Sequence, residues 1–182
     1  MLRITYISSE SYKLSSDDLL AILGKCNKNN QRLGLTGMLI YGNGTFIQSV
    51  EGDEKIVKNT ISKISSDTRH KDFKVLSEEI AEKRLYDEFN MGFERLTEDS
   101  ISNITSLKSL SLKQLNSQFL SKNTQVVEDL LQRHRSTHWN LKWTPDLRQQ
   151  FKWDTVTRNG VNHDRDKKAQ RTPAGAQSQG RA

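Results

Sequence analysis

The chain has 182 residues, a length suited to one domain with an appended segment, and its 28 Lys and Arg outnumber 22 Asp and Glu. A hydrophobic content of 34% and a mean hydropathy of −0.74 predict that part of the chain stays outside a packed core. One cysteine excludes internal disulfides and multi-cysteine metal sites, and no apolar run approaches the roughly 18 residues of a membrane span. We therefore expect a soluble, cytoplasmic protein without a metal site.

The first elements are a strand and a helix. Apolar side chains occupy every second position from Leu2 to Tyr6, which predicts a strand over residues 2–8 with Tyr6 on its apolar face. The Ser-Ser-Asp-Asp run at 15–18 predicts a helix start. The asparagines at 27–30 predict the end of this helix, because their side chains compete for backbone hydrogen bonds.

A β-hairpin follows. Apolar runs at 38–41 and 45–51 flank Gly-Asn-Gly at 42–44, residues that tolerate the positive φ of a tight turn. In the second run Phe46, Gln48 and Val50 share one face. A buried amide without hydrogen bonds costs roughly 1–3 kcal/mol, so Gln48 is expected to have partners.

A second helix is predicted from Asp53 to about residue 66, followed by strands at 73–80 and 89–96. The order is strand, helix, hairpin, helix, strand, strand. This order predicts an α+β fold, a ferredoxin-like βαββαββ sandwich with two helices on one face of the sheet.

The C-terminal half carries the whole charge excess. Residues 1–97 hold 14 basic and 14 acidic side chains, whereas 98–182 hold 14 and 8. Helices are predicted at 107–119 and 124–135, and they are expected either to cover the open face of the sheet or to meet a partner. We predict three regions: a domain at 1–97, a helical extension at 98–136 and a basic, largely disordered tail at 137–182.

Tyr6 and Gln48 are expected on neighbouring strands, facing the helices, with Asn29 and Asn30 at the end of the first helix in the same layer. Together they can hydrogen-bond the donor and acceptor edge of a flat heteroaromatic ring. Taken one at a time, simpler roles remain open: Tyr6 bonded to a backbone carbonyl in the core, and Asn30 as a helix cap.

The segments that combine these residues resemble a BLUF domain, the sensor of blue light that uses FAD. They are "TYIS" at 5–8, "NNQRLGLTGMLIYGNGTFIQSVEG" at 29–52, "DTRH" at 67–70 and "MGF" at 91–93. The resemblance spans residues 1–97 and implies the ferredoxin-like fold with a flavin ring between the two helices. FAD is the implied cofactor, with FMN and riboflavin left open.

The resemblance also implies roles. Tyr6 matches the electron and proton donor, Gln48 the residue whose hydrogen bonds rearrange, by rotation or tautomerism, and Met91 a residue that can approach Gln48. The position two residues before Met91, where the family often has Trp, is Phe89, which cannot donate a hydrogen bond. The residues implied to bind the cofactor are Tyr6, Ile22, Asn29, Asn30, Gln48, Lys63, Ile64, Asp67, Arg69 and His70.

For the output, the resemblance implies a photoreceptor rather than an enzyme. No catalytic motif follows residue 97, so we expect a protein partner of unknown identity. The resemblance also implies a homo-oligomer. An alternative is a ferredoxin-like interaction or nucleic-acid-binding module that acts through the basic, Trp-containing segment after residue 137, although no nucleic-acid-binding motif is present there. A flavin enzyme is disfavoured because no dinucleotide fingerprint for a reductant appears.

Overall fold

The computed structural model describes residues 1–86, 90–104 and 107–136. All of them lie in the first of the two units into which the chain divides, residues 1–147 and 148–182. The predicted tail at 137–182 and Phe89 lie outside the described residues. Within the described ranges, no helix is long and apolar enough to cross a membrane.

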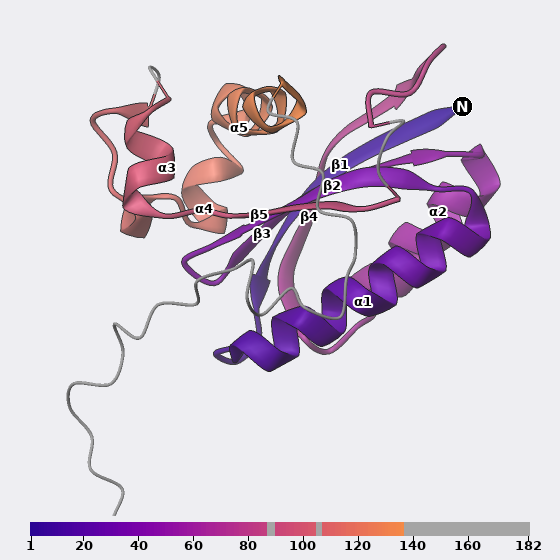
Figure 1. Ribbon diagram of the computed structural model, residues 1–182, viewed down its shortest axis with the longest axis horizontal. Coiled ribbons are helices and arrows are strands. Elements are labelled where there is room, and N and C mark those ends of the chain that lie inside the picture. The colour runs from indigo at the N-terminus through magenta and orange to yellow at the C-terminus, as the bar shows by residue number, and fades with distance from the viewer. Residues whose placement is uncertain (87–89, 105–106, 137–182) are drawn as a thin grey trace, which may run out of the picture. The chain divides into compact units, whose positions relative to one another are not determined.

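A five-stranded sheet forms the middle layer (Figure 1). Its order is β4-β1-β3-β2-β5, with all neighbours antiparallel except β2 and β5, which are parallel. The strands are β1 (Leu2–Glu10), β2 (Thr36–Gly42), β3 (Thr45–Gly52), β4 (His70–Ile80) and β5 (Gly92–Arg95). The predicted α+β, ferredoxin-like βαββαββ arrangement is confirmed.

The predicted hairpin joins β2 to β3. Asn43 (φ 48°) and Gly44 (φ 72°) both adopt left-handed backbone angles, as a two-residue turn between twisted strands requires. This turn sets the register of β2 and β3, and the register in turn directs Gln48 to one face of the sheet and Glu51 to the other.

Helices α1 (Ser16–Leu33) and α2 (Glu54–Ser65) lie on the same side of the sheet (Figure 1). Ser15 caps α1 through a capping box with Asp18, and Asp53 caps α2. The apolar face between helices and sheet contains Leu19, Ile22 and Leu23 from α1 and Val57 and Ile61 from α2.

Helix α1 extends past the end that the sequence predicted. The asparagines at 27–30 remain helical, and the helix ends where Gly34 adopts a left-handed conformation, with its N–H bonded to the carbonyls of Asn30 and Gln31. The prediction of an end near 27–30 was wrong because competing side chains only weaken a helix, whereas a glycine at this position supplies a favourable stop.

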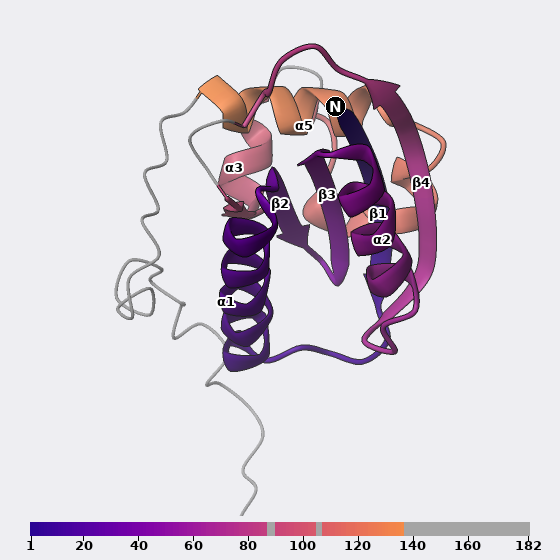
Figure 2. The same cartoon turned by 90° about the vertical axis from the view of Figure 1, so that its right-hand side faces the viewer.

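The C-terminal elements cover the opposite face of the sheet (Figure 2). They are α3 (Glu98–Ser102), the 3₁₀ helix η2 (Leu112–Gln114), α4 (Ser117–Leu120) and α5 (Thr124–Ser136). Leu107, Leu120 and Leu130 are fully buried in one cluster with Ile7 of β1 and Ile47 of β3. Of the two expectations for these helices, covering the sheet is therefore the one that the structure supports.

The single helix predicted at 107–119 is wrong, whereas the helix predicted at 124–135 is confirmed as α5. In place of the first, η2 and α4 form separate short turns. Ser111 pairs with the side chain of Gln114, and the Asn116 side chain accepts from Phe119 N–H. Polar side chains that bond to nearby backbone start new turns and interrupt a continuous helix.

Candidate functional site

Tyr6 and Gln48 face each other directly across β1 and β3. The Tyr6 hydroxyl donates to Gln48 Oε1, and both side chains are buried, with exposed fractions of 1% and 3%. Burial raises the pKa of Tyr6 well above its usual value, so the phenol keeps its proton and can donate. The hydroxyl thus bonds to a side chain and not to a backbone carbonyl, the simpler arrangement that the sequence left open.

Met91 extends this contact to the start of β5. Gln48 Nε2 lies 3.5 Å from Met91 Sδ, a weak acceptor, and Met91 is 6% exposed. A continuous buried path therefore runs from Tyr6 through Gln48 to Met91.

Asn30 contacts the same region from the last turns of α1. Its Nδ2 donates to the backbone carbonyl of Asn90 over 2.8 Å, next to Met91, and the side chain is 4% exposed. In the part of the chain that the structure describes, no group donates to Asn30 Oδ1. Because Gly34 caps the helix, Asn30 is not merely a cap. Asn29 is adjacent and half-buried.

The two helices provide the apolar sides of the site. Ile22 lies two turns before Asn30 on α1 and is buried, and α2 contributes the half-buried Ile64. Cys26 occupies the turn between Ile22 and Asn30, and burial raises the pKa of its thiol to about 11. Lys63 has an exposed side chain in the last turn of α2, so the structure does not bring it together with the others.

The 67–70 segment lies at the edge of the same layer. Arg69 Nε donates to Asp67 Oδ1 over 2.9 Å, and this hydrogen bond holds the pKa of Asp67 well below its usual value. The backbone carbonyl of Arg69 accepts from the Ser11 N–H over 2.9 Å, in the segment that leads from β1 to α1. Asp67 and Arg69 are both half-buried, so they are not a purely surface cluster.

His70 links β4 to the sheet interior. Its Nδ1 forms a 2.9 Å hydrogen bond with Ser8 Oγ, and its ring centroid lies 4.9 Å from that of Phe46. Burial lowers the pKa of His70, so the neutral ring is favoured over the charged one. The imidazole therefore supplies a neutral polar group on the helix-covered face.

These residues fit a flat heteroaromatic ring. Gln48 Nε2 and the Asn30 carboxamide retain hydrogen-bonding capacity beyond the contacts described above, and both amides are buried. Amides offer both donors and acceptors, as the edge of an isoalloxazine ring requires, and the two helices on this side of the sheet carry Ile22 and Ile64. Among the described residues no cluster of His, Cys, Asp and Glu could hold a metal ion.

A separate groove of about 460 Å³ lies on the opposite face, under α5. Arg3, Thr5 and Ser49 of the sheet and Val127 of α5 are among its lining residues. It does not include Tyr6, Gln48 or Asn30, so it is distinct from the candidate site.

Sequence reasoning missed three residues of the site. The Phe73 ring lies 4.6 Å from that of Tyr6, Ser8 bonds to His70, and Cys26 lies between Ile22 and Asn30. The spacing of four residues on α1 could have identified Cys26. The position of Phe73 beside Tyr6 could not be predicted, because two irregularities in the register of β4 with β1 break the simple alternation of side chains.

The chain is similar to known proteins in both sequence and fold. The family model for BLUF, "Sensors of blue-light using FAD", matches residues 1–92. Photoactivated adenylate cyclase subunit beta of Euglena gracilis is 31% identical over 123 residues, which cover 68% of this chain and 14% of the relative. The corresponding subunit of Euglena longa is 41% identical over 69 residues, 38% of this chain and 8% of the relative. The chain thus spans only a small part of these curated relatives.

Solved structures show the same architecture. A bacterial light-regulated adenylyl cyclase matches with a TM-score of 0.56 and 34% identity, over 70% of this chain and 35% of the other. The photo-activated state of BlsA matches with a TM-score of 0.60 over 71% of this chain and 93% of the other, and at 23% identity it supports the fold alone.

The fold and the buried phenol and amides between sheet and helices define a sensor module of the flavin-dependent class. The family match covers half of the chain, and the chain belongs to the BLUF family of blue-light sensors, whose domains bind FAD.

Proposed function

We propose that residues 1–97 sense blue light through a hydrogen-bond switch formed by Tyr6 and Gln48. One observation carries the proposal: Tyr6, Gln48 and Met91 form a continuous buried path from β1 to the start of β5. A phenol is an oxidisable group, and its partner Gln48 can exchange donor for acceptor without any covalent change.

The switch depends on the two different ends of the Gln48 carboxamide, one of which accepts a hydrogen bond while the other donates one. In the structure, Gln48 Oε1 accepts from Tyr6, and Nε2 points to Met91. A half-turn of the carboxamide presents Nε2 to Tyr6 and Oε1 to the Met91 side, and tautomerism exchanges the roles without rotation. Either way the phenol must accept where it previously donated, so the two states differ in hydrogen bonding.

Bound FAD would supply the absorption of blue light and an excited state that can oxidise a phenol. Tyr6 would serve as the electron and proton donor, and its burial excludes water from the exchange. Since no lasting covalent bond forms in the switch, the original arrangement of Gln48 returns in the dark.

The other proposed contacts to the cofactor differ in how far the geometry supports them. Asn30 and Gln48 would bind the polar edge of the ring, and Ile22 and Ile64 would pack against its faces. The 67–70 segment would contact the ribityl chain through Asp67, Arg69 and His70. Asn29, which is half-buried, would lie beside Asn30 at the ring, and Lys63, whose side chain is exposed, would contact the cofactor from the outside.

The output is proposed to pass through β5 to the C-terminal layer. Met91 immediately precedes β5, which pairs with β2, and Met38 and Ile40 of β2 pack in the cluster that holds the C-terminal helices. A change at Gln48 can therefore reach the packing of residues 98–136, the proposed output region. Relatives are photoactivated cyclase subunits, so a protein effector, separate or fused, is the proposed partner. The chain itself is proposed to have no enzymatic activity and to form homo-oligomers.

The test replaces Gln48 with Leu, which keeps the side chain's size but removes both hydrogen-bonding groups. We expect the purified variant to retain flavin but to lose the red shift of its absorption after blue light. Gln31, exposed on α1, offers the matched control, and Gln31→Leu should show the full shift. A full red shift in Gln48→Leu would reject the switch.

A further inference from the structure

Glu51 is a fully buried charged residue close to the proposed switch. It lies on β3, three residues after Gln48, and its exposed fraction is 0%. Because side chains alternate along a strand, its carboxylate lies on the opposite face of the sheet from the Gln48 carboxamide. A buried carboxylate is retained only where donors surround it, so its partners are informative.

Four residues from three segments of the chain donate to this carboxylate. Arg3 Nε and Thr36 Oγ1 each lie 2.9 Å from it. The backbone N–H of Leu85 lies 3.0 Å from each carboxylate oxygen, and that of Tyr86 lies 2.8 Å from Oε1. Glu51 therefore holds the backbone at 85–86, in the connection from β4 to β5, against the end of β3.

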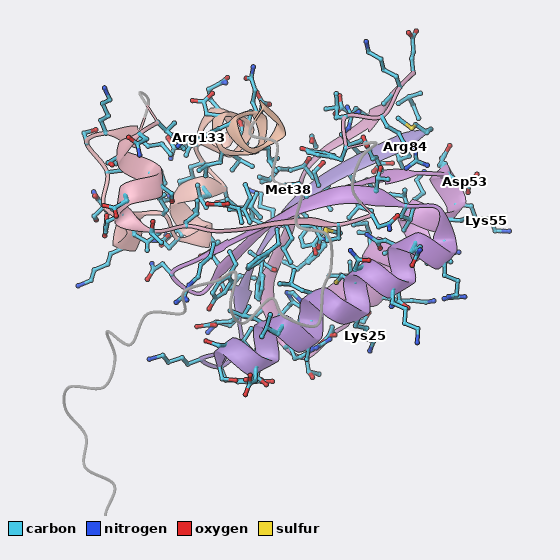
Figure 3. All side chains as sticks on the ribbon, in the orientation of Figure 1. Lys25, Met38, Asp53, Lys55, Arg84 and Arg133 are labelled. Carbon is cyan, nitrogen blue, oxygen red and sulfur yellow. The ribbon has the colours of Figure 1, made fainter. Side chains whose placement is uncertain are left out.

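Neighbouring arginines reinforce this attachment. Arg3 Nη2 donates to the carbonyl of Lys83 over 3.1 Å. Arg84 donates to Thr36 Oγ1 and to the carbonyl of Gly34, which ends α1, each over 2.7 Å. Figure 3 shows Arg84 at the same end of the molecule as Asp53, which caps the start of α2. Residues 83–86 are thus fixed to the sheet and to α1 at once.

The position of Tyr86 limits that of Met91. Only residues 87–89, which lie outside the described ranges, separate Tyr86 from Asn90. At roughly 3.3–3.6 Å per residue, this connection spans at most about 14 Å. Asn90 accepts from Asn30, and Met91 contacts Gln48, so the far end of the connection belongs to the switch.

We propose that Glu51 is a positioning residue for the light switch: by holding the backbone of Leu85 and Tyr86, its carboxylate sets how closely Met91 approaches Gln48. This inference rests on the function proposed above. The two ends of the Gln48 carboxamide must exchange their hydrogen-bonding roles inside a packed environment, and Met91 contacts one of these ends. When Met91 is held less closely against Gln48, the energy barrier to this exchange is lower.

The first variant is Glu51→Gln, which preserves shape but replaces one of the two acceptor oxygens with an NH2 group, which can only donate and so cannot accept from the Leu85 N–H. We expect bound flavin and a red shift of normal size, with dark recovery at least fivefold faster than in the wild type. Glu79→Gln is the matched control, because Glu79 also binds Arg3, over 3.0 Å, whereas the backbone N–H groups of 85–86 donate to Glu51. Its recovery rate should stay within twofold of the wild type.

A second comparison separates positioning from a general loss of stability. In a Met91→Ala background the group to be positioned is gone, so Glu51→Gln should change recovery by less than about 1.5-fold. An equal acceleration in both backgrounds, or recovery of Glu51→Gln within twofold of the wild type, would overturn the proposal. A wild type without any red shift would instead reject the function on which it rests.

A measurement on the wild type covers the case in which Glu51→Gln fails to fold. Coupling between two sites is reciprocal, so if the attachment affects the switch, the switch must affect the attachment. The Leu85 and Tyr86 amides should exchange hydrogen at rates that differ at least threefold between dark and continuous blue light. Equal rates would contradict the coupling.

Discussion

Replacing Tyr6 with Phe isolates the hydrogen bond at the centre of the site. Phenylalanine keeps the ring and its contact with Phe73 at 4.6 Å, so the packing of the core is retained. The hydroxyl is lost, and Gln48 Oε1 loses the donor that the structure gives it. The photoreceptor should then bind flavin and show no red shift, because the electron and proton donor is missing.

The effect on stability can be derived from burial. Gln48 is 3% exposed, so water does not replace the lost hydroxyl. A buried acceptor left without a donor costs about 1–3 kcal/mol, and a loss of about 2 kcal/mol corresponds to a fall in Tm of roughly 4–8 °C for a chain of this size. Tyr12, which is 54% exposed, provides the control: Tyr12→Phe should change the free energy of unfolding by less than about 0.5 kcal/mol.

The assay combines urea denaturation with dark and lit absorption spectra of each variant. A double variant, Tyr6→Phe with Gln48→Leu, removes both partners and leaves no orphaned polar group. It should therefore be about 2 kcal/mol more stable than the sum of the two single changes predicts. Strict additivity would refute the direct bond, and a normal red shift in Tyr6→Phe would refute the role of the phenol.

Three further predictions, made with four variants, test other parts of the account. Asn30→Ala should weaken flavin binding at least tenfold in a titration. Burial raises the pKa of Glu94 from 4.5 to about 7. Because the folded state then binds a proton that the unfolded state has lost, the free energy of unfolding should fall by about 1–2 kcal/mol from pH 4.5 to 7. Glu94→Gln should flatten this pH dependence in urea titrations. Gly37→Ala should abolish soluble expression, because the new Cβ would lie 2.2 Å from the Ser49 carbonyl oxygen. Gly34→Ala has no atom within 4 Å of its new Cβ, so only the left-handed backbone angle should matter, and the free energy of unfolding should fall by about 1 kcal/mol.

The N-terminal fold could be predicted because its signals are local. Alternation in β1 and β3, the turn residues before β3 and the caps of α1 and α2 each determine an element from a few neighbouring residues. The C-terminal layer lacks such signals. Its buried leucines at 107, 115 and 120 follow no helical period, since they are brought together by long-range packing against β1 and β3.

The residues of the site also differ in whether a local sequence pattern reveals them. Tyr6 and Gln48 were predictable because strand order and period place them opposite each other. The burial of Glu51 was not predictable, since a charged residue near a strand end usually faces solvent. Its burial depends on Arg3, Thr36 and the 85–86 backbone, which approach from distant parts of the chain and leave no local pattern.

The central claim is that this chain senses blue light through a flavin, and one absorption spectrum of the purified wild type, recorded in the dark and after blue light, tests it most directly. The account predicts a flavin spectrum that shifts to the red under blue light and returns in the dark, in line with the BLUF match over residues 1–92. Bound flavin whose spectrum does not change on illumination, or protein that binds no flavin, would contradict it.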